Sequence, residues 1–194
     1  DAVPEIERAP ARGVGGRAPD LARAGVPDLG IAGAPVLGDA RRAVDLAGVG
    51  PQLLGLGVWS VIGVFIAAHA TFAAEVGGCM AETGSGGGMA AAAIVEMKGG
   101  TLQQSIAAAS LALQNSLGII CDPIGNRVEA PCLGRNVMAA TNAVSCANMA
   151  LSDYEQLIPL DEVIETMKAV GDQIHHTLRC TNLGGLSITN AAKK

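Results

Sequence analysis

The sequence predicts an all-α fold, and three observations support this class. After about residue 53, apolar residues recur at helical spacing, and no convincing stretch alternates apolar and polar residues as a strand does. Glycines and capping residues divide this part of the chain into segments of ordinary helix length. Hydrophobic residues make up 49% of the chain, mostly Ala, Val, Leu, Ile and Met, so a sizeable helical core is available.

The beginning of the chain differs in composition from the rest. Residues 1–50 hold six of the nine arginines, most of the prolines and no lysine, and "RAPARGVGGRAPDLARAGVPDLG" indicates loops and short turns. A length of 194 residues fits one domain. We expect a single domain over residues 1–194, incomplete at its N-terminus, with a loop-rich part at 1–52 and a helical part at 53–194.

One apolar segment is long enough to raise the possibility of a membrane span. "LLGLGVWSVIGVFIAAHATFAA", residues 53–74, carries no formal charge apart from any on His69, and its length meets the criterion for a spanning helix. It is also rich in Gly and Ala, and no cluster of Lys or Arg flanks it. We therefore favour a central helix that is buried on all sides over a membrane protein.

The following helices can be placed from their end signals. "GGMAAAAIVEMKGG" predicts an Ala-rich helix that Gly99 and Gly100 stop, and "TLQQ" supplies a capping box for a helix that runs to about Gly118. A further helix should begin near residue 134 and reach about residue 151. In "PLDEVIETMKAVG", apolar residues share one face, acidic residues occupy the first turn, and Gly171 is the expected stop.

The five cysteines are the main carriers of chemistry in this sequence: Cys79, Cys121, Cys132, Cys146 and Cys180. Their odd number, without a secretory signal, makes a disulfide framework unexpected. Cys146 lies in the helical run "NAVSCANMAL" and is expected to be an inert buried thiol. Cys79, Cys121 and Cys132 each lie beside Gly or Pro, in loops, where ligands and catalytic groups concentrate.

Three of these cysteines could meet at one metal centre. Cys79 precedes one predicted helix, Cys121 follows another and Cys132 precedes a third, and helix ends can converge in a bundle. A helix N-terminus also favours the thiolate form of a cysteine. Three thiolates are too few for a closed zinc site, so they suit an iron–sulfur cluster with one open iron, or zinc with a fourth ligand elsewhere.

Two longer stretches carry a family resemblance. "GGCMAETGSGGGMAAAAIVEMKGG" and "LGIICDPIGNRVEAPCLGRNVMAA" resemble the iron–sulfur-dependent L-serine dehydratases, specifically their α chain or catalytic domain. Cys121 lies 42 positions after Cys79, and Cys132 lies 11 positions after Cys121, as in that family. "LRCTNLGGL" is similar to a late family motif. The resemblance covers residues 61–190.

The resemblance implies an all-helical catalytic domain in which Cys79, Cys121 and Cys132 bind a [4Fe-4S] cluster. The fourth iron would act as a Lewis acid on L-serine, and elimination of water would give aminoacrylate, which hydrolyses to pyruvate and ammonia. Pyridoxal phosphate is not expected, since it needs a Schiff-base lysine. The lysines lie at predicted helix ends or the terminus: Lys98, Lys168, Lys193 and Lys194.

The other candidate site residues are weaker, and each has a structural alternative. His69 is a candidate general base, although a His in an apolar run is more often a packed core residue. Thr71 matches a small hydroxyl position in the family and could bind substrate. Arg135 and Asn136 match a family "RN" and could hold the substrate carboxylate, support the cluster loop, or only be polar groups at a helix start.

Partners and location are expectations of the same kind. The formal net charge of −5 argues against nucleic acid as a partner. The resemblance implies L-serine as substrate, a β chain or regulatory domain as partner, an oligomer and a cytoplasmic location. Ala11 and Cys180 stand where the family often has Thr and Glu. The alternative function is a non-catalytic helical subunit that binds a metal or serves in assembly.

Overall fold

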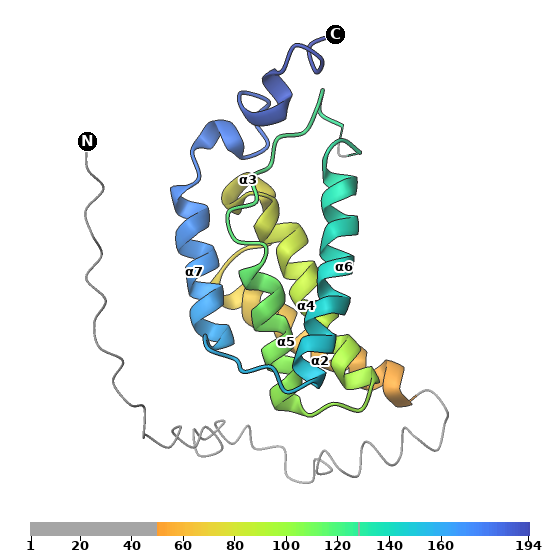
Figure 1. Cartoon of the computed structure of the whole chain (residues 1–194). Helices are drawn as coiled ribbons and strands as arrows, with labels where there is room; N and C mark the ends of the chain where they lie inside the picture. Colours follow the sequence, from red (N-terminus) through yellow and green to blue (C-terminus); the bar gives the residue numbers. More distant parts are fainter. Residues whose placement is uncertain (1–49, 128) are drawn as a thin grey trace, which may run out of the picture. The chain divides into compact units, whose positions relative to one another are not determined.

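The computed structural model describes residues 50–127 and 129–194, and over these residues the fold is all-α, as predicted (Figure 1). Two isolated backbone bridges are present, but the described residues form no sheet. The helices are α2 (Gly50–His69), α3 (Ala74–Gly77), η2 (Met80–Gly84), α4 (Ser85–Met97), α5 (Leu102–Gln114), α6 (Cys132–Leu151), α7 (Leu160–Gln173), η3 (His176–Leu178) and η4 (Gly185–Ile188).

The predicted capping signals are present at the helix ends. Thr101 and Gln104 form the reciprocal capping box that opens α5. Gly99, at a φ of 78°, follows the end of α4, a conformation that favours glycine. The first turn of α7 carries two acidic residues at its positive end. These local signals account for most of the helix boundaries.

Helix α2 is not buried on all sides, so that prediction was wrong. Ile62 and Ile66 pack into the core, and Gly63 lies against Met89 of α4. The opposite side of α2 is exposed: Val61 and Val64 keep 68% and 70% of their accessible surface. A uniformly apolar sequence has no polar face to mark its outer side, which is why its orientation could not be predicted. No helix in the described part of the chain has the length and apolar character that crossing a membrane requires.

Small side chains allow α4, α5 and α6 to pack closely. Their shared core is mostly alanine, joined by Val95 and Cys146. Cys146 is buried with its thiol free, as expected for a structural cysteine. Because alanine side chains end at Cβ, the helix backbones can approach closely, and larger residues at these positions would push the helices apart.

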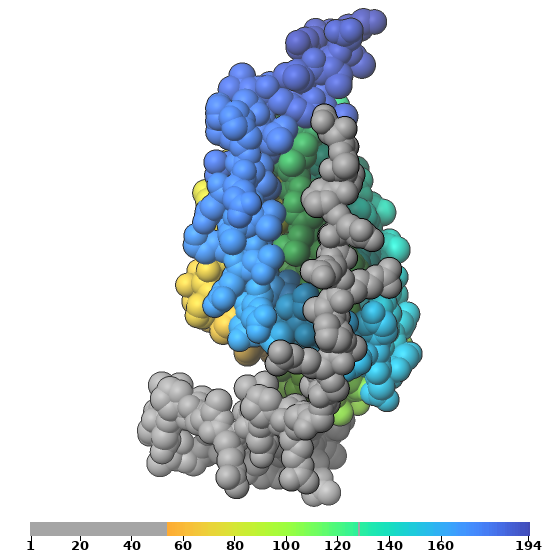
Figure 2. Space-filling view, turned by 60° about the vertical axis from the view of Figure 1, so that its left-hand side comes forward, coloured from red at the N-terminus to blue at the C-terminus, as the bar shows by residue number. Residues whose placement is uncertain are grey.

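Helix α7 covers a second core that α2, α4 and α5 also line. The predicted face of α7 is correct, since Val163, Ile164 and Met167 are buried there. Figure 2 shows α7 in blue beside the green segment that contains α5. Gly171 does not stop the helix, which continues to Gln173. Instead, a Cβ at Gly171 would lie 3.0 Å from the Cα of Gly77, so this glycine permits close contact with α3.

Several helix ends meet at one end of the bundle. The starts of α4 and α6 and the ends of α5 and α7 lie there, together with α3, the loop after α5 and the segment after α7 (Figure 1). This convergence places the cysteine-bearing loops together. The predicted boundary at residue 52 falls at the edge of the described residues, and nearly all of the loop-rich part, including Ala11, lies outside them. The division into parts therefore stays a prediction.

Candidate metal centre

Three cysteine sulfurs converge at this end of the bundle. The Sγ atoms of Cys79, Cys121 and Cys132 all lie within 4.8 Å of one another, and all three residues are buried. The Sγ atoms of Cys79 and Cys132 are 3.8 Å apart. Ala74 and Ile119 pack against this group. Three soft sulfur donors in a small, dry space form a donor set that suits zinc or an iron–sulfur cluster.

Each of these cysteines occupies a defined position relative to a helix. Cys79 directly precedes η2, a π-helical turn, a type of distortion that is frequent at functional sites. Cys132 is the first residue of α6. Gly78, at a φ of 73°, carries the chain into Cys79 and lies against the carbonyl of Ile119, where a Cβ would be only 2.7 Å from that oxygen. This glycine therefore allows the Cys79 turn and the loop before Cys121 to meet.

Arg135 joins the three-cysteine site to its supporting loop. Its Nη2 pairs with Oδ1 of Asp122 at 2.6 Å, and its Nη1 donates to the carbonyl of Ile120 at 2.9 Å and lies 3.6 Å from Sγ of Cys79. Asp122 is buried, and its other oxygen accepts a hydrogen bond from the backbone N–H of Leu186. One guanidinium thus fixes both neighbours of Cys121 and places positive charge beside the Cys79 sulfur.

Burial, rather than the helix dipole, dominates the ionisation of Cys79. Burial raises the pKa of the Cys79 thiol to about 11, Arg135 opposes this shift by its hydrogen bond, and Cys132 adds to it. The expected lowering of a thiol pKa by a helix N-terminus does not prevail at this residue. Without a metal, Cys79 is therefore a neutral thiol at pH 7, and binding a metal would release its proton.

A disulfide joins Cys121 to Cys180, although the odd number of cysteines had made a disulfide unexpected. Two backbone hydrogen bonds hold these residues together: the Cys121 N–H donates to Leu178, and the Cys180 N–H donates to Cys121, each at 2.8 Å. The two cysteines are 59 positions apart, so no local pattern could reveal the contact. Because Cys121 also belongs to the three-cysteine site, all three sulfurs can bind a metal only after this disulfide is reduced.

The segment after α7 completes the wall of the site. Besides the bond from Leu186 to Asp122, the Ser187 hydroxyl donates to the carbonyl of Pro123 at 2.7 Å. Gly185 has a φ of 59°, and a methyl group there would overlap the Asp122 side chain. The "TNLGGL" motif that contributed to the family resemblance is thus explained by close packing on the Cys121 loop.

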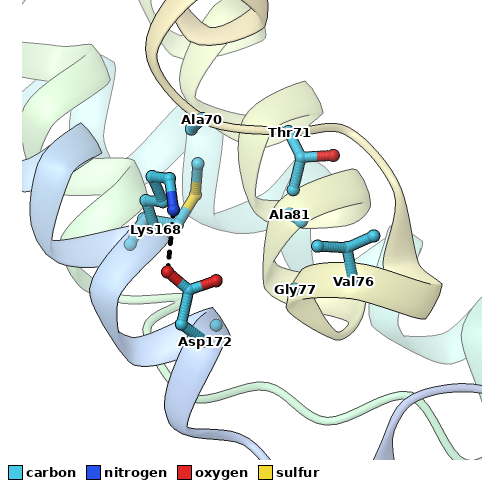
Figure 3. A pocket seen from close by; sticks show the side chains of 9 residues that line it. Ala70, Thr71, Val76, Gly77, Ala81, Lys168 and Asp172 are labelled. Carbon is cyan, nitrogen blue, oxygen red and sulfur yellow. Dashed lines mark hydrogen bonds and ion pairs between the residues drawn. The ribbon is translucent and has the colours of Figure 1, made fainter.

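Thr71 lines a separate cavity of about 130 Å³ next to the cysteine site. Figure 3 shows this cavity between the Thr71–Ala81 region and α7, with Lys168 and Asp172 on its α7 side. The Thr71 hydroxyl accepts a hydrogen bond from the backbone of Ala73. None of the three site cysteines lines the cavity, but Gly77 and Ala81, which flank Cys79 in sequence, do.

For the remaining candidates, His69 and Asn136, the described contacts do not place the side chain against the cysteine sulfurs. His69 ends α2, is exposed, stacks on Phe65 and shares a hydrogen bond with its carbonyl. Asn136 donates to the carbonyl of Cys132, one turn earlier in α6. Roles for both in catalysis stay predictions.

The family described as "Serine dehydratase alpha chain" matches residues 51–187. The chain is 48% identical over 130 residues to the "Probable L-serine dehydratase, alpha chain" of Latilactobacillus sakei, which covers 67% of this chain and 62% of that protein. It is 47% identical over 133 residues to the "L-serine dehydratase, alpha chain" of Peptoniphilus asaccharolyticus, covering 69% of this chain and 46% of that protein.

A longer relative has a similar level of identity over a smaller share of its own length. The "L-serine dehydratase" of Mycobacterium bovis is 45% identical over 119 residues, which are 61% of this chain but 26% of that protein. The chain therefore spans less than two thirds of the length of these relatives. The matched region includes the three site cysteines, Asp122, Arg135 and the segment that closes on them.

Proposed function

The chain belongs to the serine dehydratase alpha chain family, and on that premise we propose that it is the cluster-binding part of an L-serine ammonia-lyase that yields pyruvate and ammonia. The observation that carries the proposal is the convergence of the Cys79, Cys121 and Cys132 sulfurs within 4.8 Å. The names of the relatives support serine as the substrate.

The proposed cofactor is a [4Fe-4S] cluster held by Cys79, Cys121 and Cys132. The donor set fits, because three buried thiols lie together and no carboxylate is among the grouped ligand atoms. Such a cluster supplies a Lewis-acidic iron that carries no protein thiolate. The guanidinium of Arg135 lies beside the Cys79 sulfur, where it would offset negative charge from the thiolates.

We assign the other residues roles in positioning and proton transfer. Arg135 and Asp122 hold the loop and the start of α6 at a fixed separation, so that the sulfurs keep their arrangement. Thr71 offers a hydroxyl at the neighbouring cavity for substrate binding. His69 is the proposed base, two residues before Thr71, and Asn136 is a proposed contact of the substrate carboxylate.

We propose that the chain uses no pyridoxal phosphate and that a β chain or regulatory domain is its partner. The Nζ of Lys168 is 2.7 Å from Asp172, and Lys98 follows the end of α4, which are poor settings for a Schiff-base lysine. The term "alpha chain" in the relatives' names supports a second chain. We propose a cytoplasmic oligomer, because a reducing compartment keeps site thiols available.

Anaerobic reconstitution tests the proposal. The full chain, reduced and supplied with ferrous iron and sulfide, should gain iron and sulfide in equal amounts and a broad visible absorbance. With its partner chain, it should then turn over L-serine much faster than D-serine, because a base fixed on one face reaches one Cα proton. Zinc alone at the site, with no activity on serine in the presence of the partner, would support a non-catalytic module instead.

A further inference from the structure

Cys180 is a fourth cysteine at the metal centre, and it has no part in the proposed three-cysteine ligand set. We propose that Cys180 forms a reversible disulfide with Cys121 that removes Cys121 from the ligand set and so prevents metal binding by all three sulfurs. The inference rests on the proposed function only for the identity of the metal group, which we take to be the iron–sulfur cluster. The disulfide itself and the three-sulfur group are features of the structure.

Backbone contacts that do not involve the disulfide itself also hold Cys121 and Cys180 together. The paired hydrogen bonds between Cys121 and residues 178 and 180 involve main-chain atoms alone. They set a Cα–Cα distance of 5.0 Å, which lies inside the range that disulfides occupy. Reduction would therefore leave two thiols facing each other, ready to bond again, rather than two separated side chains.

The Cys121 sulfur cannot bind a metal and form the disulfide with Cys180 at the same time. In the disulfide, Sγ of Cys121 has no thiolate form, and the thiolate is the metal ligand. Cys79 and Cys132 then remain as two sulfurs, 3.8 Å apart, which are too few to hold a cluster. Metal binding by all three sulfurs and the Cys121–Cys180 disulfide are thus mutually exclusive states of one site.

Accessibility makes Cys180 the point of entry for an oxidant. Cys79, Cys121 and Cys132 are 0%, 3% and 7% exposed, whereas Cys180 is partly exposed. Attack on an external disulfide requires access to the thiol. A small oxidant would react with Cys180 first. Cys121, which lies beside it, would then attack the mixed disulfide on Cys180 and form the protein disulfide.

The proposed oxidant is a low-molecular-weight disulfide such as oxidised glutathione. The Cys180 thiolate attacks one sulfur of that disulfide, its S–S bond breaks, and one small thiolate leaves as a mixed disulfide forms on Cys180. The Cys121 thiolate then attacks Sγ of Cys180 and releases the second small thiolate. Two protein thiols lose two electrons, the oxidant becomes two thiols, and the two cysteine protons pass to those thiols.

Cobalt(II) binding to the full metal-free chain tests this inference, with no reductant or sulfide present during the titration. The chain is divided into a reduced sample and a sample treated with oxidised glutathione, and both are freed of small thiols. In the treated sample, alkylation after unfolding should modify two fewer cysteines, and peptide mapping should join Cys121 to Cys180. A cobalt titration followed by the thiolate-to-cobalt charge-transfer absorbance should give the treated sample an affinity at least about tenfold weaker than that of the reduced sample. Loss of a group that only hydrogen-bonds to a metal ligand already weakens binding by about this much.

Two variants separate the possible outcomes. Cys180→Ser should bind cobalt as the reduced wild type does, and oxidised glutathione should not weaken that binding. Cys146→Ser is the matched control, because it removes a buried thiol outside the site and should behave as wild type under both conditions.

Three results would overturn the inference. The first is equal cobalt binding by both samples once the disulfide is mapped, and the second is a glutathione-induced disulfide between other cysteines. The third is loss of cobalt binding in reduced Cys180→Ser, which would make Cys180 a ligand. Failure of the proposed function is a different result, namely cobalt binding by the reduced chain without any iron–sulfur cluster on reconstitution.

Discussion

Arg135 of α6 and the buried Asp122 of the preceding loop form an ion pair, with Nη2 2.6 Å from Oδ1. The side chains are 18% and 2% exposed. The pair connects the helix that begins with Cys132 to the loop that carries Cys121. Its loss would therefore affect the arrangement of the sulfurs as well as the stability of the fold.

Asp122→Asn should lower the free energy of unfolding by about 3 kcal/mol, because it leaves a mostly buried guanidinium without its counter-charge. Denaturant unfolding monitored by circular dichroism measures this change. Asp172→Asn is the matched control, since the Lys168–Asp172 pair is 54% and 55% exposed and its loss should cost less than about 1 kcal/mol. Equal losses in the two variants would contradict a structural role for the Arg135 pair.

Replacing any one of the three site cysteines should prevent cluster formation. Cys79→Ser, Cys121→Ser and Cys132→Ser each remove a thiolate ligand, so visible absorbance and bound iron should fall to background after reconstitution. Cys146→Ser should retain both, because Cys146 lies in the alanine-rich core between α4, α5 and α6. An intact cluster in Cys121→Ser would refute the ligand assignment.

Two glycines with nearly the same φ offer a test of the contact on Asp122. Gly125 and Gly185 have φ values of 58° and 59°, but a Cβ at Gly125 meets nothing within 4 Å, whereas one at Gly185 overlaps Asp122. Gly125→Ala should cost about 1–2 kcal/mol for its left-handed backbone. Gly185→Ala should cost at least about 1 kcal/mol more, from loss of the Leu186–Asp122 hydrogen bond. Thermal unfolding of the two variants provides the comparison.

Cys146 should resist alkylation in the folded protein. Burial raises the pKa of its thiol, while a hydrogen bond from Asn115 acts in the opposite direction. Below that raised pKa the thiol is neutral, so iodoacetamide at pH 8 should modify it far more slowly than Cys180 of the reduced protein, which is partly exposed. Peptide mass spectrometry over time measures both rates, with guanidinium-unfolded protein as the control. Equal rates in the folded protein would contradict the burial of Cys146.

The sequence predicted those parts of the fold that depend on neighbours in the chain. The capping box at Thr101 and the buried face of α7 follow from short-range patterns, and the structure contains both. The convergence of the three cysteines was predicted from their positions at helix ends and from the family resemblance. Contacts between distant segments were not predictable: Cys121 with Cys180, and Asp122 with Leu186, are brought together only by the folded chain. The exposed side of α2 was missed because its sequence is apolar all round.

Residues 178–187, after α7, should open locally at a lower cost in free energy than the helical bundle. The two larger cores are built from α2, η2, α4, α5, α6 and α7, whereas residues 178–187 join the Cys121 loop mainly through main-chain and polar contacts. Local detachment of this segment can therefore uncover the sulfurs while the bundle stays folded, and amide exchange at Cys180 and Leu186 should be faster than inside α4. The disulfide would raise the cost of that detachment, so the oxidised protein should exchange these amides more slowly.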